Sequence, residues 1–256
     1  MFTSNPFAAL GDFPSPALMQ IYVVMMLLAV IAGTLFDIAH KGSARYFFAS
    51  MRRSKRNARK PLGSGELASI LVQTALVDVA TSGEFCNPRR RLAHLLTMYG
   101  FVVYVATTAI LVFDPGTTGP VAQLWWLGGV MVCVGGYWFW FFIRVDVLAE
   151  GHSPFRLVRA DLFILSLLAS VTLGLLWAWA QAMGSPGARV LFYLYILATT
   201  VLFGSVPWSK FAHMFFKPAA AFEKRLSYAN ETRSNLPAPA DKPEQFGSAR
   251  ELPRHY

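Results

Sequence analysis

The sequence predicts an all-α integral membrane protein: a five-transmembrane-helix bundle, N-out and C-in, with a cytoplasmic loop and tail. Composition is the first reason, because 55% of the 256 residues are hydrophobic and only 14% are charged. Soluble domains usually have about 25% charged residues. This deficit of charge disfavours a soluble enzyme. The two cysteines are also too few for a four-thiolate zinc site or a cysteine-bound iron–sulfur cluster.

Five apolar runs define the predicted spans. They are Leu18–Ile38, Leu92–Phe113, Val121–Ile143, Leu162–Ala182 and Val190–Val206. Each run is long enough to cross a hydrocarbon core of about 30 Å as a helix. Turns rich in proline and glycine follow the second and fourth runs. We therefore expect a five-helix membrane domain over residues 18–220, preceded by a periplasmic N-terminus over residues 1–17.

Positive charge sets the predicted orientation. No Lys or Arg precedes the first run, whereas 11 of the 23 cations lie between the first and second runs. An outside N-terminus places 22 of the 23 on the cytoplasmic side, as the positive-inside rule requires. The sequence thus predicts a multi-pass protein of the bacterial inner (cytoplasmic) membrane. The missing basic segment also argues against a cleaved signal peptide.

The predicted cytoplasmic loop, residues 40–91, carries two features. Its basic run, Arg52 to Arg56, fits contact with anionic lipid better than contact with nucleic acid, with partner docking as the alternative. Apolar residues in Gly65–Val79 follow a helical pattern, which predicts an interfacial or docking helix. After the last span we expect a short helix to about Leu226. The cytoplasmic tail, residues 221–256, is predicted to be partly disordered.

Two histidines suggest a haem site. Spans two and five run in opposite directions, so His94 and His213 reach similar depth near the inner face. Imidazoles on two apolar helices are what a six-coordinate b-type haem requires. The alternative is that they are polar residues at the membrane interface. His40 is a weaker candidate, and His152 and His255 are expected to be solvated.

Further residues fit around this site. We expect Arg90, Arg91 and Lys210 to pair with haem propionates. Gly100 would let a helix backbone approach the macrocycle. Ser209 would accept the second ring N–H of His213.

Other activities find no support in the chain. No charged residue lies in the middle of a span, which disfavours a proton-coupled transporter. Nucleophile triads, P-loops and zinc-binding helix motifs are also missing from the sequence. The aromatic residues of the third span fit an interfacial belt or a surface for a quinone ring. A non-catalytic or quinone-interacting subunit is the function class that remains.

Two motifs resemble a known family. The segment from Arg91 to Phe101, RLAHLLTMYGF, resembles the start of helix two in the nitrate reductase gamma-like cytochrome b membrane subunits. The segment from Pro207 to Pro218, PWSKFAHMFFKP, resembles the end of their helix five. The likeness covers roughly residues 18–220, and it is strongest to the membrane anchors of dissimilatory adenylylsulfate (APS) reductase.

The resemblance implies a function in dissimilatory sulfur metabolism. A cytoplasmic flavin and iron–sulfur oxidoreductase would dock on this chain, which would connect it with membrane quinone. His94 and His213 fall on the family's cytoplasm-proximal haem ligands. At the positions of the second, periplasm-proximal haem this sequence has Tyr104 and Tyr195, so we expect one haem b. A haem-free structural anchor for the same kind of complex is the alternative.

Overall fold

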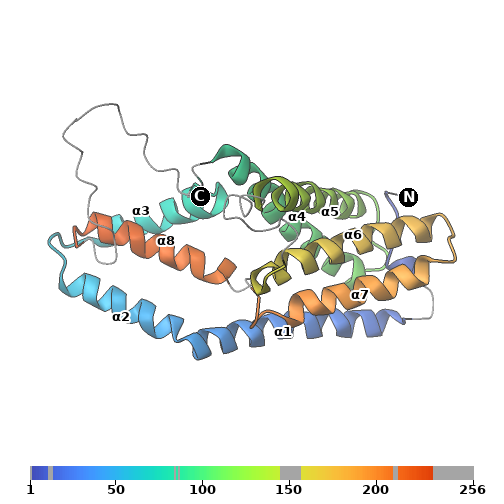
Figure 1. Cartoon of the computed structure of the whole chain (residues 1–256), viewed down its shortest axis with the longest axis horizontal. Helices are drawn as coiled ribbons and strands as arrows, with labels where there is room; N and C mark the ends of the chain where they lie inside the picture. Colours follow the sequence, from blue (N-terminus) through green and yellow to red (C-terminus); the bar gives the residue numbers. More distant parts are fainter. Residues whose placement is uncertain are drawn as a thin grey trace. The chain divides into compact units, whose positions relative to one another are not determined.

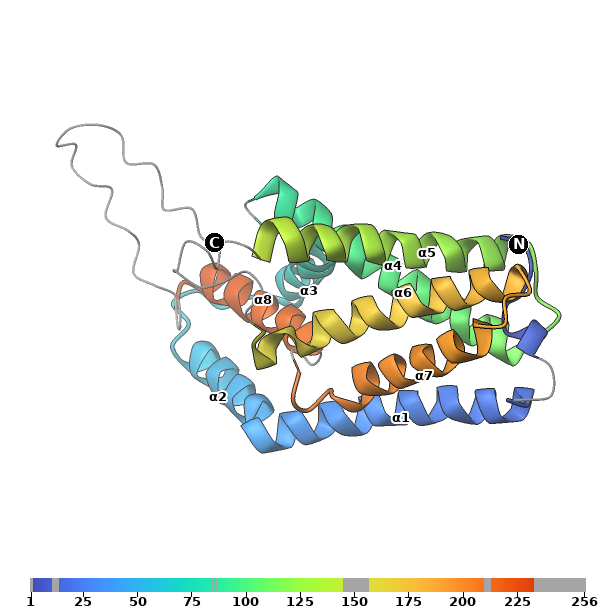
Figure 2. The same cartoon turned by 45° about the vertical axis from the view of Figure 1, so that its right-hand side comes forward.

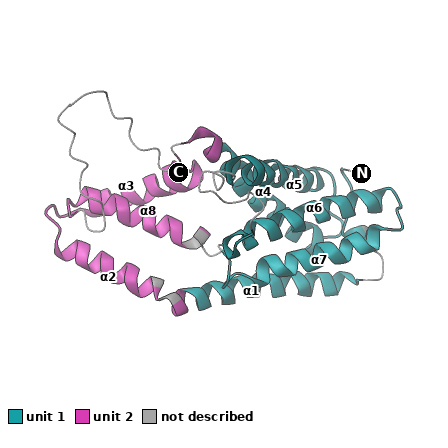
Figure 3. Ribbon diagram, viewed as in Figure 1, with its two compact units in different colours: residues 1–37, 92–212 teal, residues 38–91, 213–256 magenta. Residues whose placement is uncertain are grey.

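The computed structural model describes residues 2–10, 14–83, 85, 87–144, 157–209 and 213–232 (Figure 1). In these ranges the chain is helical and contains no strand. It divides into two compact units, which Figure 3 distinguishes by colour. Unit 1 comprises Met1–Asp37 and Leu92–Ala212, and unit 2 comprises Ile38–Arg91 and His213–Tyr256.

All five predicted spans are helical. They correspond to α1 (Pro16–Lys41), α4 (Pro88–Phe113), α5 (Pro120–Trp138) with the π-helix η3 (Phe139–Ile143), α6 (Leu162–Ala182) and α7 (Ala188–Gly204). Among the described helices, four segments are long and apolar enough to cross a membrane: Pro16–His40, Pro88–Phe113, Pro120–Ile143 and Arg159–Ala182. The fifth, α7, has 17 residues, and a helix of that length is about 26 Å long. The fold is therefore all-helical with four candidate spans and one shorter apolar helix.

Glycine pairs on α5 bring three helices of unit 1 together. A Cβ atom at Gly128 or Gly135 would lie within 2.8 Å of the α4 backbone. A Cβ atom at Gly129 or Gly136 would collide instead with leucine side chains of α6. The pairs are seven residues apart, which is two helical turns, so each helix meets the same face of α5 twice. Figure 2 shows α6 lying between α5 and α7.

The α6–α7 contact is also close and is partly polar. Ser170 and Thr199 share a buried hydrogen bond of 2.7 Å. On the other side of α7, the Tyr22 hydroxyl of α1 donates to the Ile196 carbonyl at 3.1 Å, and α1 lies beside α7 in both views (Figures 1 and 2). Most of α1 remains exposed, including large apolar side chains such as Leu27 and Leu35. Exposed apolar side chains suit a helix that faces lipid.

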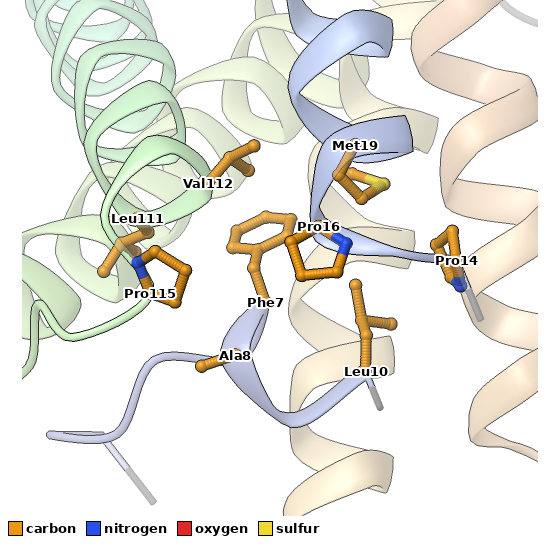
Figure 4. Close-up of a pocket in the computed structure, with 9 residues that line it drawn as sticks. All are labelled: Phe7, Ala8, Leu10, Pro14, Pro16, Met19, Leu111, Val112 and Pro115. Atoms are coloured by element: carbon orange, nitrogen blue, oxygen red, sulfur yellow. The ribbon is translucent and has the colours of Figure 1, made fainter. Parts of the chain in front are cut away.

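The N-terminal segment is part of the core of unit 1. The buried Asn5 side chain donates to the Leu111 carbonyl at 2.8 Å and accepts the Phe7 N–H at 2.9 Å. The Phe7 ring packs between Trp125 and Trp177, with ring centroids 6.0 and 5.2 Å away. Beside it is a cavity of about 50 Å³ between residues of α1 and α4 (Figure 4). The predicted periplasmic segment thus closes one end of the bundle, which we call the loop end.

Unit 2 combines the predicted loop with the segment after the last span. It contains α2 (Ser43–Arg56), α3 (Ser64–Gln73), the π-helix η2 (Thr74–Ala80) and α8 (His213–Ala229). The helix predicted over Gly65–Val79 is confirmed, α2 was not predicted, and α8 begins five residues before Pro218. Arg225 on α8 pairs with Asp78 on η2, its Nη2 donating to Oδ1 at 2.9 Å. Residues 233–256, the remainder of the predicted tail, lie outside the described residues.

Candidate functional site

His94 lies in the second turn of α4 and is half-buried. It does not share the α4 face that packs on α5, which is formed by Ala93, Gly100 and Tyr104. Two turns later on the His94 face, the Phe101 ring meets the Phe203 ring of α7 with centroids 6.5 Å apart. The proposed ligand therefore belongs to the side of α4 that turns toward α7.

His213 is placed differently from the prediction. The helix α7 ends at Gly204, and His213 is the first residue of α8 in unit 2 rather than a residue on the fifth span. Ser209 is buried in a bend that follows α7, and its predicted hydrogen bond with His213 stays a prediction. The His213 side chain and Lys210 lie outside the description.

Two other predicted haem contacts have protein partners. A Cβ atom at Gly100 would lie 2.8 Å from the Gly128 carbonyl oxygen of α5, so α5 fills the space next to this glycine. The close approach seen at Gly100 is thus to another helix, and the predicted approach to a macrocycle stays a prediction. Arg91 donates from Nε to the Thr81 carbonyl at 2.7 Å, which ties it to the end of η2. Arg90 is half-buried on the first turn of α4.

The interior toward the loop end is filled by aromatic side chains. Tyr104 stacks on the fully buried Trp125 at 5.1 Å, and Tyr195 stacks on Trp177 at 5.7 Å. The Tyr104 hydroxyl and the Tyr195 ring both lie against Gly174, where a Cβ atom would collide with them. The residues present do not fit a second macrocycle here, because the required volume is occupied by these rings.

Two cavities lie at the loop end of unit 1. The 50 Å³ cavity beside Phe7 holds no more than a water or two, since a water occupies about 30 Å³. A larger open groove of about 520 Å³ is lined by Trp177, Arg189 and Tyr193. His94 lies near the opposite end of α4 from Leu111, which lines the smaller cavity. No cluster of three or more metal-ligating side chains occurs in the described part of the chain.

Unit 2 exposes an apolar helix face. Leu71, Val72 and Leu76 on α3 and η2 are each more than half exposed, whereas Ile70 on the opposite side is buried. The two acidic residues of this segment are paired, Asp78 with Arg225 and Glu66 with Lys60 at 2.8 Å. The hydrogen bond from Lys60, together with one from the Gly63 N–H, lowers the pKa of the Glu66 carboxyl. The exposed surface is therefore apolar and close to neutral.

Comparisons of the chain with protein-family models, with curated proteins and with solved structures found no match. The fold by itself defines the class: an all-helical protein with several long apolar helices, compatible with a multi-pass membrane protein.

Proposed function

We propose that this chain is the membrane anchor and electron-transfer subunit of an oxidoreductase complex. Its soluble partner would be a cytoplasmic flavin and iron–sulfur enzyme similar to APS reductase, and membrane quinone would exchange electrons with the complex. The five apolar helices would all lie in the bacterial inner membrane, N-out and C-in. The short α7 would then span by local thinning of the bilayer or with the help of flanking residues.

The main support for the anchor function is that one chain contains two units of different kinds. Unit 1 has lipid-compatible helices, of which α1 is the most exposed. Unit 2 is compact and is held by the Arg225–Asp78 ion pair, yet it leaves Leu71 and Leu76 exposed. Exposed apolar patches on a packed unit are typical of interaction sites. We propose that this face of α3 and η2 receives the soluble partner.

One b-type haem is the proposed redox group. His94 is half-buried on the α7-facing side of α4, and His94 and His213 are the residues that would hold the haem iron. When bound, the haem would supply single-electron redox chemistry, and the apolar helices would exclude water from its site. A second haem is not proposed, since Tyr104 and Tyr195 fill the corresponding interior. The alternative function, a haem-free anchor, keeps the same docking surface and leaves electron transfer to the partner.

Visible spectra of ligand variants test the haem. We expect the purified, dithionite-reduced chain to have a b-type α-band that His94→Ala and His213→Ala each abolish. Membrane insertion should persist because the apolar helices drive it. His40→Ala is the matched control and should leave the spectrum unchanged. A folded, partner-bound protein without an α-band would support the haem-free alternative.

A further inference from the structure

The helix α2 carries a strongly positive surface. Between Asp37 and Glu66 the chain has eight Lys or Arg residues and no acidic one. The cations on α2 itself are all exposed: Arg45, Arg52, Arg53, Lys55 and Arg56. None of these five forms an ion pair with an acidic side chain of the described residues. The described protein therefore leaves this charge without a counter-charge.

Apolar side chains gather on one side of the same helix, which among the cations of α2 also carries Lys55, four residues after Met51. Ala44, Phe47, Phe48 and Met51 follow the spacing i, i+3, i+4 and i+7, which places them on one side of α2. The Phe48 side chain is 58% exposed even though its ring contacts Phe47 at 5.5 Å. Basic helices with a distinct aromatic and apolar face bind in the plane of membrane interfaces.

The third side of α2 packs against α8 and the turn that follows α8. Ser54 is fully buried and accepts a hydrogen bond from the Asn230 side chain at 2.8 Å. Ser50 on the same side is also buried. This contact fixes the rotation of α2 within unit 2, so that the serines face protein while Phe48 and the arginines remain accessible.

Chain connectivity brings α2 to the membrane surface. One residue, Gly42, separates α2 from α1, and its φ of +63° allows the turn between the two helices. Because α1 contains the apolar segment Pro16–His40, α2 begins where the chain leaves the hydrocarbon. At that depth aromatic side chains meet acyl chains and cations meet phosphates.

We propose that α2 lies in the membrane surface and binds anionic phospholipid. Phe48 and Met51 would enter the acyl-chain boundary, and Arg45, Arg52 and Arg56 would bind lipid phosphates. The cation-free face of α3 and η2 would remain for a protein partner. This assignment goes beyond the anchor function and does not depend on the haem or on the identity of the soluble partner.

Spin labelling of the full-length chain tests this proposal. In a background with Cys86→Ser and Cys133→Ser, a nitroxide is attached at Phe48→Cys or, on the cationic face, at Ala49→Cys. The protein is placed in nanodiscs of phosphatidylcholine with or without phosphatidylglycerol. With phosphatidylglycerol, we expect the label at position 48 to be more accessible to oxygen, which concentrates in the acyl chains, than the label at position 49. The label at position 48 should also be less accessible to a nickel chelate, which stays in water. This difference should be lost without the anionic lipid.

Charge variants test whether the arginines of α2 bind lipid headgroups or whether α2 enters the membrane surface without such binding. The triple variant Arg52→Gln, Arg53→Gln and Arg56→Gln should lose the effect of phosphatidylglycerol. The equal charge change Arg159→Gln, Arg189→Gln and Lys224→Gln, at exposed cations elsewhere, should keep it. If the first triple variant folds poorly, Arg52→Gln alone should give a smaller loss. Equal nickel accessibility at positions 48 and 49, or immersion unaffected by anionic lipid, would overturn the proposal.

Discussion

At the residue scale, single glycines set the distance between helices of unit 1. Gly135 is buried, and a Cβ atom there would lie 2.6 Å from the Ala93 carbonyl oxygen of α4. That oxygen belongs to the backbone, so it can move only if the whole helix moves. Gly204 differs, because a Cβ atom there would meet nothing within 4 Å.

This difference predicts opposite effects for the same substitution. Gly135→Ala should lower the free energy of unfolding by about 1–3 kcal/mol, as overpacking in a close-packed interior usually does. Gly204→Ala should be neutral or slightly stabilising, because alanine favours a helix over glycine. Thermal unfolding of both variants in the same detergent is the measurement. Equal melting temperatures would contradict the close contact at Gly135.

A buried amide near the N-terminus leads to a second prediction. The Asn5 side chain joins Leu111 on α4 to the backbone of Phe7, so Asn5→Ala leaves a buried carbonyl and N–H without this partner. We expect the free energy of unfolding to fall by about 1–3 kcal/mol and backbone hydrogen exchange over residues 2–10 to become faster. Asn57→Ala, at the exposed end of α2, is the control and should change neither measurement.

At the scale of elements, unit 2 separates its ionic contacts from its apolar surface. The Arg225–Asp78 pair connects α8 with η2, and Ile70 on α3 is buried. Leu71 and Leu76, both exposed, lie five residues apart with no charged residue between them. Apolar contact is not directional, so partner binding through this face should depend on buried area rather than on ion pairs.

Acidic residues introduced on the exposed apolar face of α3 and η2 should therefore weaken binding of the soluble partner. We expect Leu71→Asp with Leu76→Asp to weaken retention of flavin and iron–sulfur absorbance on the tagged chain by about tenfold, equivalent to about 1.4 kcal/mol. Wild-type retention should survive 1 M salt, at which electrostatic screening acts within about 3 Å. Tyr228→Asp, an exposed position on α8, is the control. Release of the wild-type partner by salt alone would contradict apolar docking.

At the scale of the whole molecule, the distribution of charge predicts the orientation of the chain. Unit 2 contains Lys55 on α2 and Lys224 on α8, whereas Thr117 lies in the α4–α5 connection of unit 1. An N-out topology places the two lysines in the cytoplasm and Thr117 outside.

Cysteine labelling in intact cells tests this topology. In a background without Cys86 and Cys133, an impermeant reagent should label Thr117→Cys but neither Lys55→Cys nor Lys224→Cys. All three should react after the membrane is permeabilised, which controls for accessibility. Labelling of either lysine position from outside would refute the N-out orientation.

The sequence alone determined the helical class and the positions of the apolar helices. Leu162–Ala182 was predicted with the observed bounds, because apolar length and flanking turns are local properties. The helix over Gly65–Val79 was predicted for the same reason. The helix α2 was missed, since its run of cations masked an apolar face that becomes visible only in the helical spacing of Phe47, Phe48 and Met51.

Only the tertiary structure decided which residues meet. Gly100 faces α5 because the glycine pairs of α5 draw α4 close. Asn5 enters the core because the N-terminal segment folds back onto Leu111, 106 residues away in the sequence. His213 begins α8, nine residues after the last apolar helix ends at Gly204. Hydropathy shows only how apolar each segment is. Contacts between segments depend on the shapes of the packed side chains and on hydrogen-bond partners that are distant in the chain.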